Sequence, residues 1–116
     1  MKNLILSTLL TVTATIYHVT PSQTDSMPDR TATNFKINMD NPELHRIIAV
    51  SRDLEAKGFK MNSIVVVSNA GDMNGLWVVR DRMHKRWTNR IDFLVDETLK
   101  GGKWNNVKIK LYEHNN

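Results

Sequence analysis

With 116 residues, the chain is long enough for one domain at most. It has no cysteine, which excludes disulfides, thiolate chemistry and a lipid anchor on cysteine. Its apolar share of 41% and charged share of 24% are those of an ordinary globular protein. The net charge of +4 and the pI of about 9.6 favour anionic partners, such as nucleic acid, acidic wall polymers or lipid headgroups, without choosing among them.

Residues 1–14, MKNLILSTLLTVTA, combine one lysine, a short apolar run and a small-residue end, as secretory signals do. We therefore expect a secreted, periplasmic or cell-envelope protein. The alternative is that these residues form the start of a first β-strand. The apolar run is too short to span a bilayer as a helix, so no stable membrane insertion is expected.

The first half of the chain predicts two strands separated by a long polar loop. Residues 11–19 are rich in Thr, Val and Ile and predict a strand, and residues 20–33 form a loop with Pro, Ser, Thr and Asp. Residues 34–39 predict a short extended piece. Asp40-Asn41-Pro42-Glu43 is a helix start, and the helix must be short because residues 46–51 return to β-type side chains.

The second half predicts a series of short strands. Residues 51–60 form a turn or single helical turn ended by Gly58, and the continuous β-branched run at 63–69 predicts a strand buried on both faces. A hairpin loop with two glycines follows at 69–75. Further strands are predicted at 76–81, 89–95 and 104–112, the last two joined by a turn with Gly101-Gly102. Six or seven short strands with little helix are typical of an all-β fold, and a small closed barrel is favoured because it leaves no long strand edge exposed.

Three aspartates follow or interrupt these β-type runs: Asp53 after IIAVSR, Asp81 after LWVVR, and Asp92 within RID. Strand ends meet at the rim of a small barrel, so the three acids are candidates for one groove. Like charges held close together raise the pKa of at least one carboxyl, and a protonated carboxyl is what general-acid chemistry needs. The alternative is that each acid pairs with a neighbouring arginine on a solvated surface, which is common and contributes little stability.

Other kinds of site find less support in the residues. The four histidines have no metal-ligand spacing, so we expect no metal, and no motif implies a cofactor. The basic segment 80–90 contains Trp87, which could stack on a base, but Asp81 and Asp92 would repel phosphates, so no nucleic-acid partner is expected. Trp77 in LWVV is predicted to be buried, whereas Trp87 in its polar loop is a candidate for stacking on a sugar.

Several motifs follow one another along the chain: TATIY (13–17), QTD (23–25), TAT (31–33), HRIIAVSRDL (45–54), GLWVVRDRMHKRWTNRID (75–92) and GKWNNVKI (102–109). Together they resemble the double-psi β-barrel domains of the RlpA-like and three-aspartate type, which occur in bacterial cell-wall enzymes and phage-encoded relatives. The resemblance covers residues 11–112 and leaves 113–116 as a tail. It implies a six- to seven-stranded double-psi barrel with one or two short helices.

The resemblance to the MltA-like murein transglycosylases also implies an activity. The chain would be a lytic transglycosylase that cleaves peptidoglycan between N-acetylmuramic acid and N-acetylglucosamine. Asp81 would act as acid and base, closing a 1,6-anhydro ring without water, while Asp53 and Asp92 shape its pKa and orient substrate. This differs from the two-carboxylate hydrolases, in which the second acid is a nucleophile or activates water. The substrate-binding residues would be Tyr17, Thr33, Arg52, Arg82, Arg86, Trp87 and Arg90.

One departure from the pattern keeps a second interpretation open. Many of the enzymatic relatives follow the middle aspartate with a Thr-Gly-Gly type of turn, whereas Asp81 is followed here by Arg82-Met83-His84-Lys85. The alternative function is a non-catalytic barrel that binds cell wall or another anionic polysaccharide. A structural component of a phage particle belongs to the same alternative.

Overall fold

A computed structural model describes residues 9–18, 36–37, 42–96 and 98–112. This part of the chain is all-β, as predicted. It contains one α-helix, α1, and two short 3-10 helices, η1 and η2, and none of these is long and apolar enough to span a membrane. The elements are β1 (Leu10–Tyr17), η1 (Pro42–His45), β2 (Ile47–Val50), α1 (Arg52–Ala56), β3 (Ile64–Ser68), η2 (Gly71–Met73), β4 (Gly75–Arg82), β5 (Arg90–Leu94) and β6 (Lys103–Leu111).

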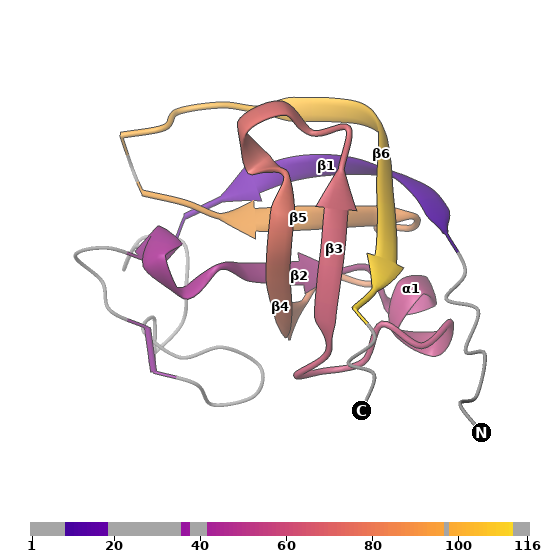
Figure 1. The fold of residues 1–116 in the computed structure, drawn as a ribbon. Helices are drawn as coiled ribbons and strands as arrows, with labels where there is room; N and C mark the ends of the chain where they lie inside the picture. The colour runs from indigo at the N-terminus through magenta and orange to yellow at the C-terminus, as the bar shows by residue number, and fades with distance from the viewer. Residues whose placement is uncertain (1–8, 19–35, 38–41, 97, 113–116) are drawn as a thin grey trace, which may run out of the picture.

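The six strands close into a barrel in the order β1-β5-β2-β4-β3-β6. Two neighbouring pairs, β1 with β5 and β2 with β4, are parallel, and the remaining pairs are antiparallel. In Figure 1, β1, β5 and β2 form one layer, and β4, β3 and β6 cross it at a steep angle. Because parallel strands cannot be joined by a tight turn, the parallel pairs require long connections along the chain.

The barrel interior is filled by aliphatic side chains from all six strands around an aromatic centre. The ring of Phe93 lies 4.6 Å from that of Trp77 and meets the ring of Trp104 edge-on at 5.6 Å. Trp77 is only 2% exposed, which confirms its predicted burial. Such ring pairs add roughly 0.5–1.5 kcal/mol beyond the burial of their area.

The expectation that β3 is buried on both faces is wrong. Val65 and Val67 point into the core, but Ile64 is 44% exposed and Ser68 is also exposed. Among the described residues, β3 lies between β4 and β6 in a single closed layer, without the helices that cover both faces of a parallel sheet. The run of β-branched residues therefore reflects strand propensity rather than two-sided burial.

A β-bulge in β4 determines the direction of Asp81. Trp77 and Val79 point inward, so strict alternation would also send Asp81 inward. The register instead pairs Ile48 with Val79 and Ala49 with Asp81, which leaves Arg80 as an extra residue on β4. After this bulge, Asp81 lies on the outer face of the barrel together with Ala49.

Residues 10–14, which the sequence also allowed as the end of a signal segment, form part of β1 in this structure. Val12 and Ala14 are 2% and 0% exposed and belong to the core. Residues 1–8, most of the predicted loop at 20–33, and the predicted helix start at Asp40 lie outside the described residues.

Candidate functional site

The strand register lines up two aspartates on the outer face of the barrel. Ala49 of β2 pairs with Asp81 of β4 on one side and with Asp92 of β5 on the other, and Asp92 pairs in turn with Thr15 of β1. Neighbouring strands are about 4.8 Å apart, so the two aspartates flank a single methyl group. Ala49 is itself only 5% exposed, so its methyl group lies beneath the surface between the two acids.

Tyr17 contacts Asp81 and is also influenced by the charge of Asp92. Its hydroxyl group donates a hydrogen bond to Asp81 Oδ2 over 3.4 Å. Burial, followed by the negative charges of Asp81 and Asp92 and by this hydrogen bond, raises the pKa of Tyr17 well above its ordinary value. The phenol therefore keeps its proton and acts as a hydrogen-bond donor, within the electrostatic field of both carboxylates.

The carboxyl group of Asp92 is partly buried. Burial raises its pKa, although a hydrogen bond donated by the Thr15 hydroxyl and the positive charge of Arg90 act in the opposite direction. A raised pKa keeps the proton on a carboxyl group at higher pH, which suits a general acid. Asp81 is held differently, because it accepts hydrogen bonds from Tyr17 and from the backbone N–H of Arg82, at 3.2 Å.

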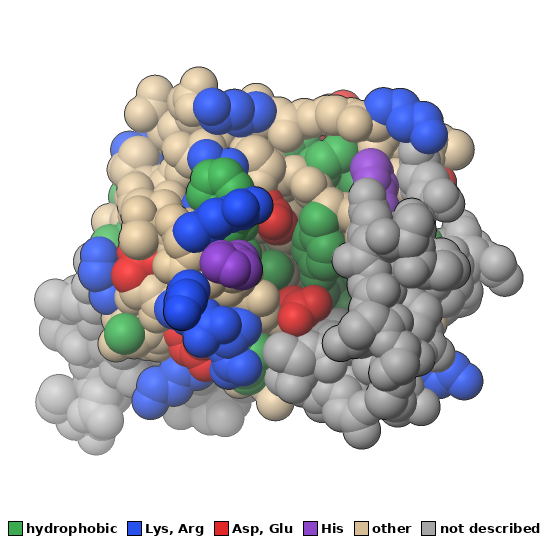
Figure 2. Space-filling view, turned by 180° about the vertical axis from the view of Figure 1, so that it is seen from behind, with side chains coloured by type: hydrophobic (Ala, Val, Ile, Leu, Met, Phe, Trp, Pro, Cys, Tyr) green, Lys and Arg blue, Asp and Glu red, His purple; other side chains and the backbone are tan. Residues whose placement is uncertain are grey.

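An apolar strip lies beside the two acids on the same outer face. Ile47 and Leu94 are fully buried and pack with Ile37, with Tyr17 and Val78 at the edge of the group. Figure 2 shows the barrel from behind, where hydrophobic side chains lie next to acidic ones, with basic side chains and a histidine to one side of them. Ile47 and Leu94 have no exposed surface, so within this group Tyr17 and Val78 are the residues that reach the surface next to the acids.

The third predicted acid, Asp53, has a different set of contacts. It lies in the first turn of α1, and both of its carboxylate oxygens accept the backbone N–H of Asn89, at 3.1 and 3.0 Å. Burial acts to raise the pKa of Asp53, but hydrogen bonds from Ser51 and Asn89 outweigh it and lower the pKa. Asp53 thus ties α1 to the residue that immediately precedes β5, the strand that carries Asp92.

Two of the arginines predicted to bind substrate make contacts around α1 instead. Arg82 forms a double hydrogen-bonded ion pair with Glu55, at 3.0 and 2.9 Å. Arg52 donates from Nε to the carbonyl oxygen of Met83 over 3.4 Å. These residues border the strand end that carries Asp81, and their side chains gather on the α1 side of it.

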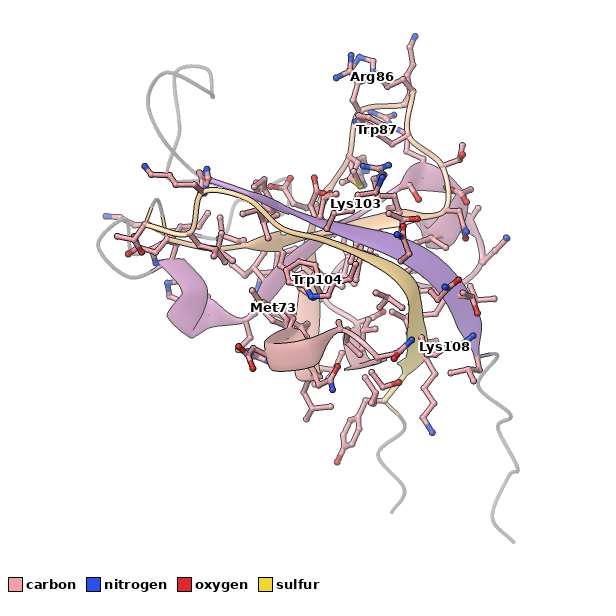
Figure 3. The ribbon with its side chains drawn as sticks, turned by 90° about the horizontal axis from the view of Figure 1, so that it is seen from above. Met73, Arg86, Trp87, Lys103, Trp104 and Lys108 are labelled. Carbon is pink, nitrogen blue, oxygen red and sulfur yellow. The ribbon has the colours of Figure 1, made fainter. Side chains whose placement is uncertain are left out.

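The other predicted binding residues form a basic loop. The guanidinium groups of Arg90 and Arg86 lie 4.3 and 5.0 Å from the centre of the Trp87 ring, within range of cation–π attraction. Figure 3 shows Arg86 and Trp87 projecting from the barrel, whereas Trp104 points into it. A sugar that stacks on Trp87 must share the ring with these cations. Thr33, the remaining predicted residue, lies outside the described part of the chain.

The sequence did not identify Thr15 and Ala49, which pair with the two aspartates across neighbouring strands. Thr15 belongs to the TATIY motif and Ala49 to AVSRD, but their meeting depends on pairings between distant segments that no local pattern reveals. Within the described residues, no three His, Asp or Glu side chains are grouped so as to hold a metal ion. Comparison of the sequence with protein-family models and with curated proteins gave no match.

Proposed function

We propose that this protein is a lytic transglycosylase that cleaves peptidoglycan between N-acetylmuramic acid and N-acetylglucosamine. The observation that carries the proposal is the pair Asp81 and Asp92, which flank Ala49 and share the field of the Tyr17 phenol. Two further points support it: the sequence resembles double-psi barrels of cell-wall enzymes, and a closed six-stranded barrel with two parallel pairs is compatible with that fold.

The chemistry requires one proton delivered to the glycosidic oxygen and one removed from the muramyl 6-hydroxyl group. The resemblance gives both steps to Asp81, while the contacts favour sharing them between the two acids. Asp92, whose pKa is raised by burial, protonates the bridging oxygen as the bond to C1 breaks. Asp81, which accepts two hydrogen bonds, takes the proton of the 6-hydroxyl group as its oxygen closes onto C1. No water is consumed, and exchange with solvent returns the proton to Asp92.

The test compares wild type, Asp81→Asn and Asp92→Asn on purified peptidoglycan, with products analysed by mass spectrometry. We expect anhydro-muropeptides from the wild type and a loss of at least about 100-fold in either variant, since acid–base catalysis contributes roughly 10²–10⁴-fold. Asp72→Asn is the matched control, because Asp72 is an exposed residue of η2 in the β3–β4 hairpin. If both site variants release products at the wild-type rate, the proposal is wrong.

The basic loop favours a second candidate function, a wall-binding barrel without turnover. Arg86 and Arg90 place two cations against the Trp87 ring, which suits an anionic polysaccharide. This alternative predicts saturable binding to sacculi that weakens with salt and with Trp87→Ala, and no soluble fragments from the wild type. Release of anhydro-muropeptides would exclude it.

A further inference from the structure

A pocket of about 500 Å³ lies beside α1, and neither Asp81 nor Asp92 lines it. Positions 52, 55 and 56 are spaced so that their side chains share one face of the helix. After α1, Gly58 adopts a positive φ of 114°, and the backbone N–H of Phe59 bonds back to the carbonyl oxygen of Leu54, which turns the chain toward the helix again. The pocket is lined by Arg52, Glu55, Ala56, Lys60 and Met61.

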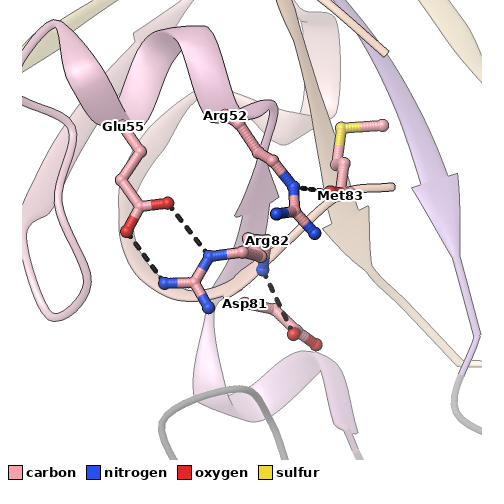
Figure 4. A network of polar contacts seen from close by, with 5 residues as sticks. All are labelled: Arg52, Glu55, Asp81, Arg82 and Met83. Carbon is pink, nitrogen blue, oxygen red and sulfur yellow. Dashed lines mark hydrogen bonds and ion pairs between the residues drawn. The ribbon is translucent and has the colours of Figure 1, made fainter. Parts of the chain in front are cut away.

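The charges in this pocket are not balanced. Its one acid, Glu55, is engaged by both nitrogens of the ion pair with Arg82, and that pair lowers the pKa of Glu55 (Figure 4). Arg52 uses only Nε, toward the carbonyl oxygen of Met83. Within the described part of the chain, the terminal nitrogens of Arg52 and the amine of Lys60 donate no hydrogen bond. Two cations therefore keep donors for a ligand.

The pocket is adjacent to the candidate site along β4. The side chain of Arg82 forms its ion pair at the pocket, while the backbone N–H of Arg82 donates to Asp81 Oδ1 over 3.2 Å. One residue therefore contacts both places. A glycan held at Asp81 would bring the groups attached to its sugar rings close to α1.

We propose that this pocket binds a carboxylate group of the peptide stem that branches from the muramyl sugar. Arg52 and Lys60 supply the hydrogen-bond donors, and Ala56 and Met61 pack against the aliphatic part of the stem. A planar guanidinium fits a carboxylate with two parallel hydrogen bonds, which gives orientation as well as affinity. The identity of the ligand rests on the proposed function, and the expected effect is on binding rather than on the chemical step.

The test measures binding to two preparations of sacculi, both freed of phosphate-bearing wall polymers: one intact, and one stripped of stem peptides by an amidase. We expect wild type to bind intact sacculi roughly tenfold more tightly than stripped sacculi, as one charged hydrogen-bonded contact allows. The double variant Arg52→Gln/Lys60→Ala should lose this preference. Lys110→Ala, which removes an exposed cation of β6, should keep it. Equal binding of wild type to both preparations, or an unchanged preference in the double variant, would overturn the proposal.

Turnover on the intact sacculi separates this inference from the proposed function. A preference for stems without anhydro-muropeptides would support the pocket and reject the transglycosylase. Anhydro-muropeptides without a preference for stems would reject the pocket and leave the transglycosylase standing. In an active protein, the double variant should raise KM and leave kcat within about twofold, because the pocket does not contact the reacting bond.

Discussion

Substitution of Asp53 distinguishes a role in catalysis from a role in positioning, because the sequence resemblance implies the first and the observed contacts favour the second. The resemblance makes it a third acid that tunes the chemistry. In the structure its carboxylate accepts the backbone N–H of Asn89, whose side chain donates to the carbonyl oxygen of Thr11 over 3.0 Å. The carbonyl oxygen of Asn89 also accepts the N–H of Thr13 at 3.2 Å. Asp53 therefore anchors a junction between α1, β1 and β5, and we expect it to act as a positioning residue.

The size of the effect follows from these contacts. Asp53→Ala removes a charged acceptor, and hydrogen bonds to charged groups contribute about 1.5–3 kcal/mol. The lower end applies because Asp53 is only partly buried, so we expect a loss of about 1.5 kcal/mol. For a chain of this size that corresponds to a fall in Tm of about 6 °C. Asp53→Asn retains one acceptor oxygen and should lose about half as much.

The assay is thermal unfolding followed by circular dichroism across a range of pH, combined with peptidoglycan turnover. Because the folded state lowers the pKa of Asp53, its stabilising contribution is present at neutral pH and is lost as the pH falls below about 4. The gap in Tm between wild type and Asp53→Ala should therefore close in acid. If Asp53→Asn keeps its Tm but loses turnover as fully as Asp81→Asn, Asp53 takes part in the chemistry and the positioning role is refuted.

Two further predictions concern the core and the buried acid. Phe93→Ala should destabilise the barrel by about 3–5 kcal/mol. It should also shift tryptophan fluorescence to the red, because the Phe93 ring packs against both Trp77 and Trp104 and its removal leaves them less shielded. The control Leu99→Ala, at an exposed position, should change neither stability nor fluorescence. Asp92→Asn should raise Tm at pH 7, because the raised pKa of Asp92 means that its ionisation opposes folding above the unfolded-state pKa of about 3.9. That gain should vanish below about pH 4, and a variant less stable than wild type at pH 7 would contradict the assignment.

The sequence by itself determined the strands and the loops between them. β-branched residues and alternation located all six strands within a few residues, because side chains on a pleated, half-buried surface must follow a period of two. The two glycines of residues 69–75 marked the β3–β4 hairpin, since Gly71 and Gly75 adopt positive φ values of 58° and 126°. Local chemistry was sufficient for these features, because each depends on neighbours in the chain.

The site depended on tertiary structure. The bulge at Arg80 reverses the direction of Asp81, and only the register of β2 against β4 reveals it. Thr15 and Asp92 are 77 residues apart in sequence and meet through a parallel pairing that no local pattern encodes. Asp53 follows a β-type run just as Asp81 does, yet its carboxylate accepts a hydrogen bond from the backbone N–H of Asn89. A residue's type shows which chemistry it can do, whereas its partners are decided by strand order and register, which depend on the closure of the whole barrel.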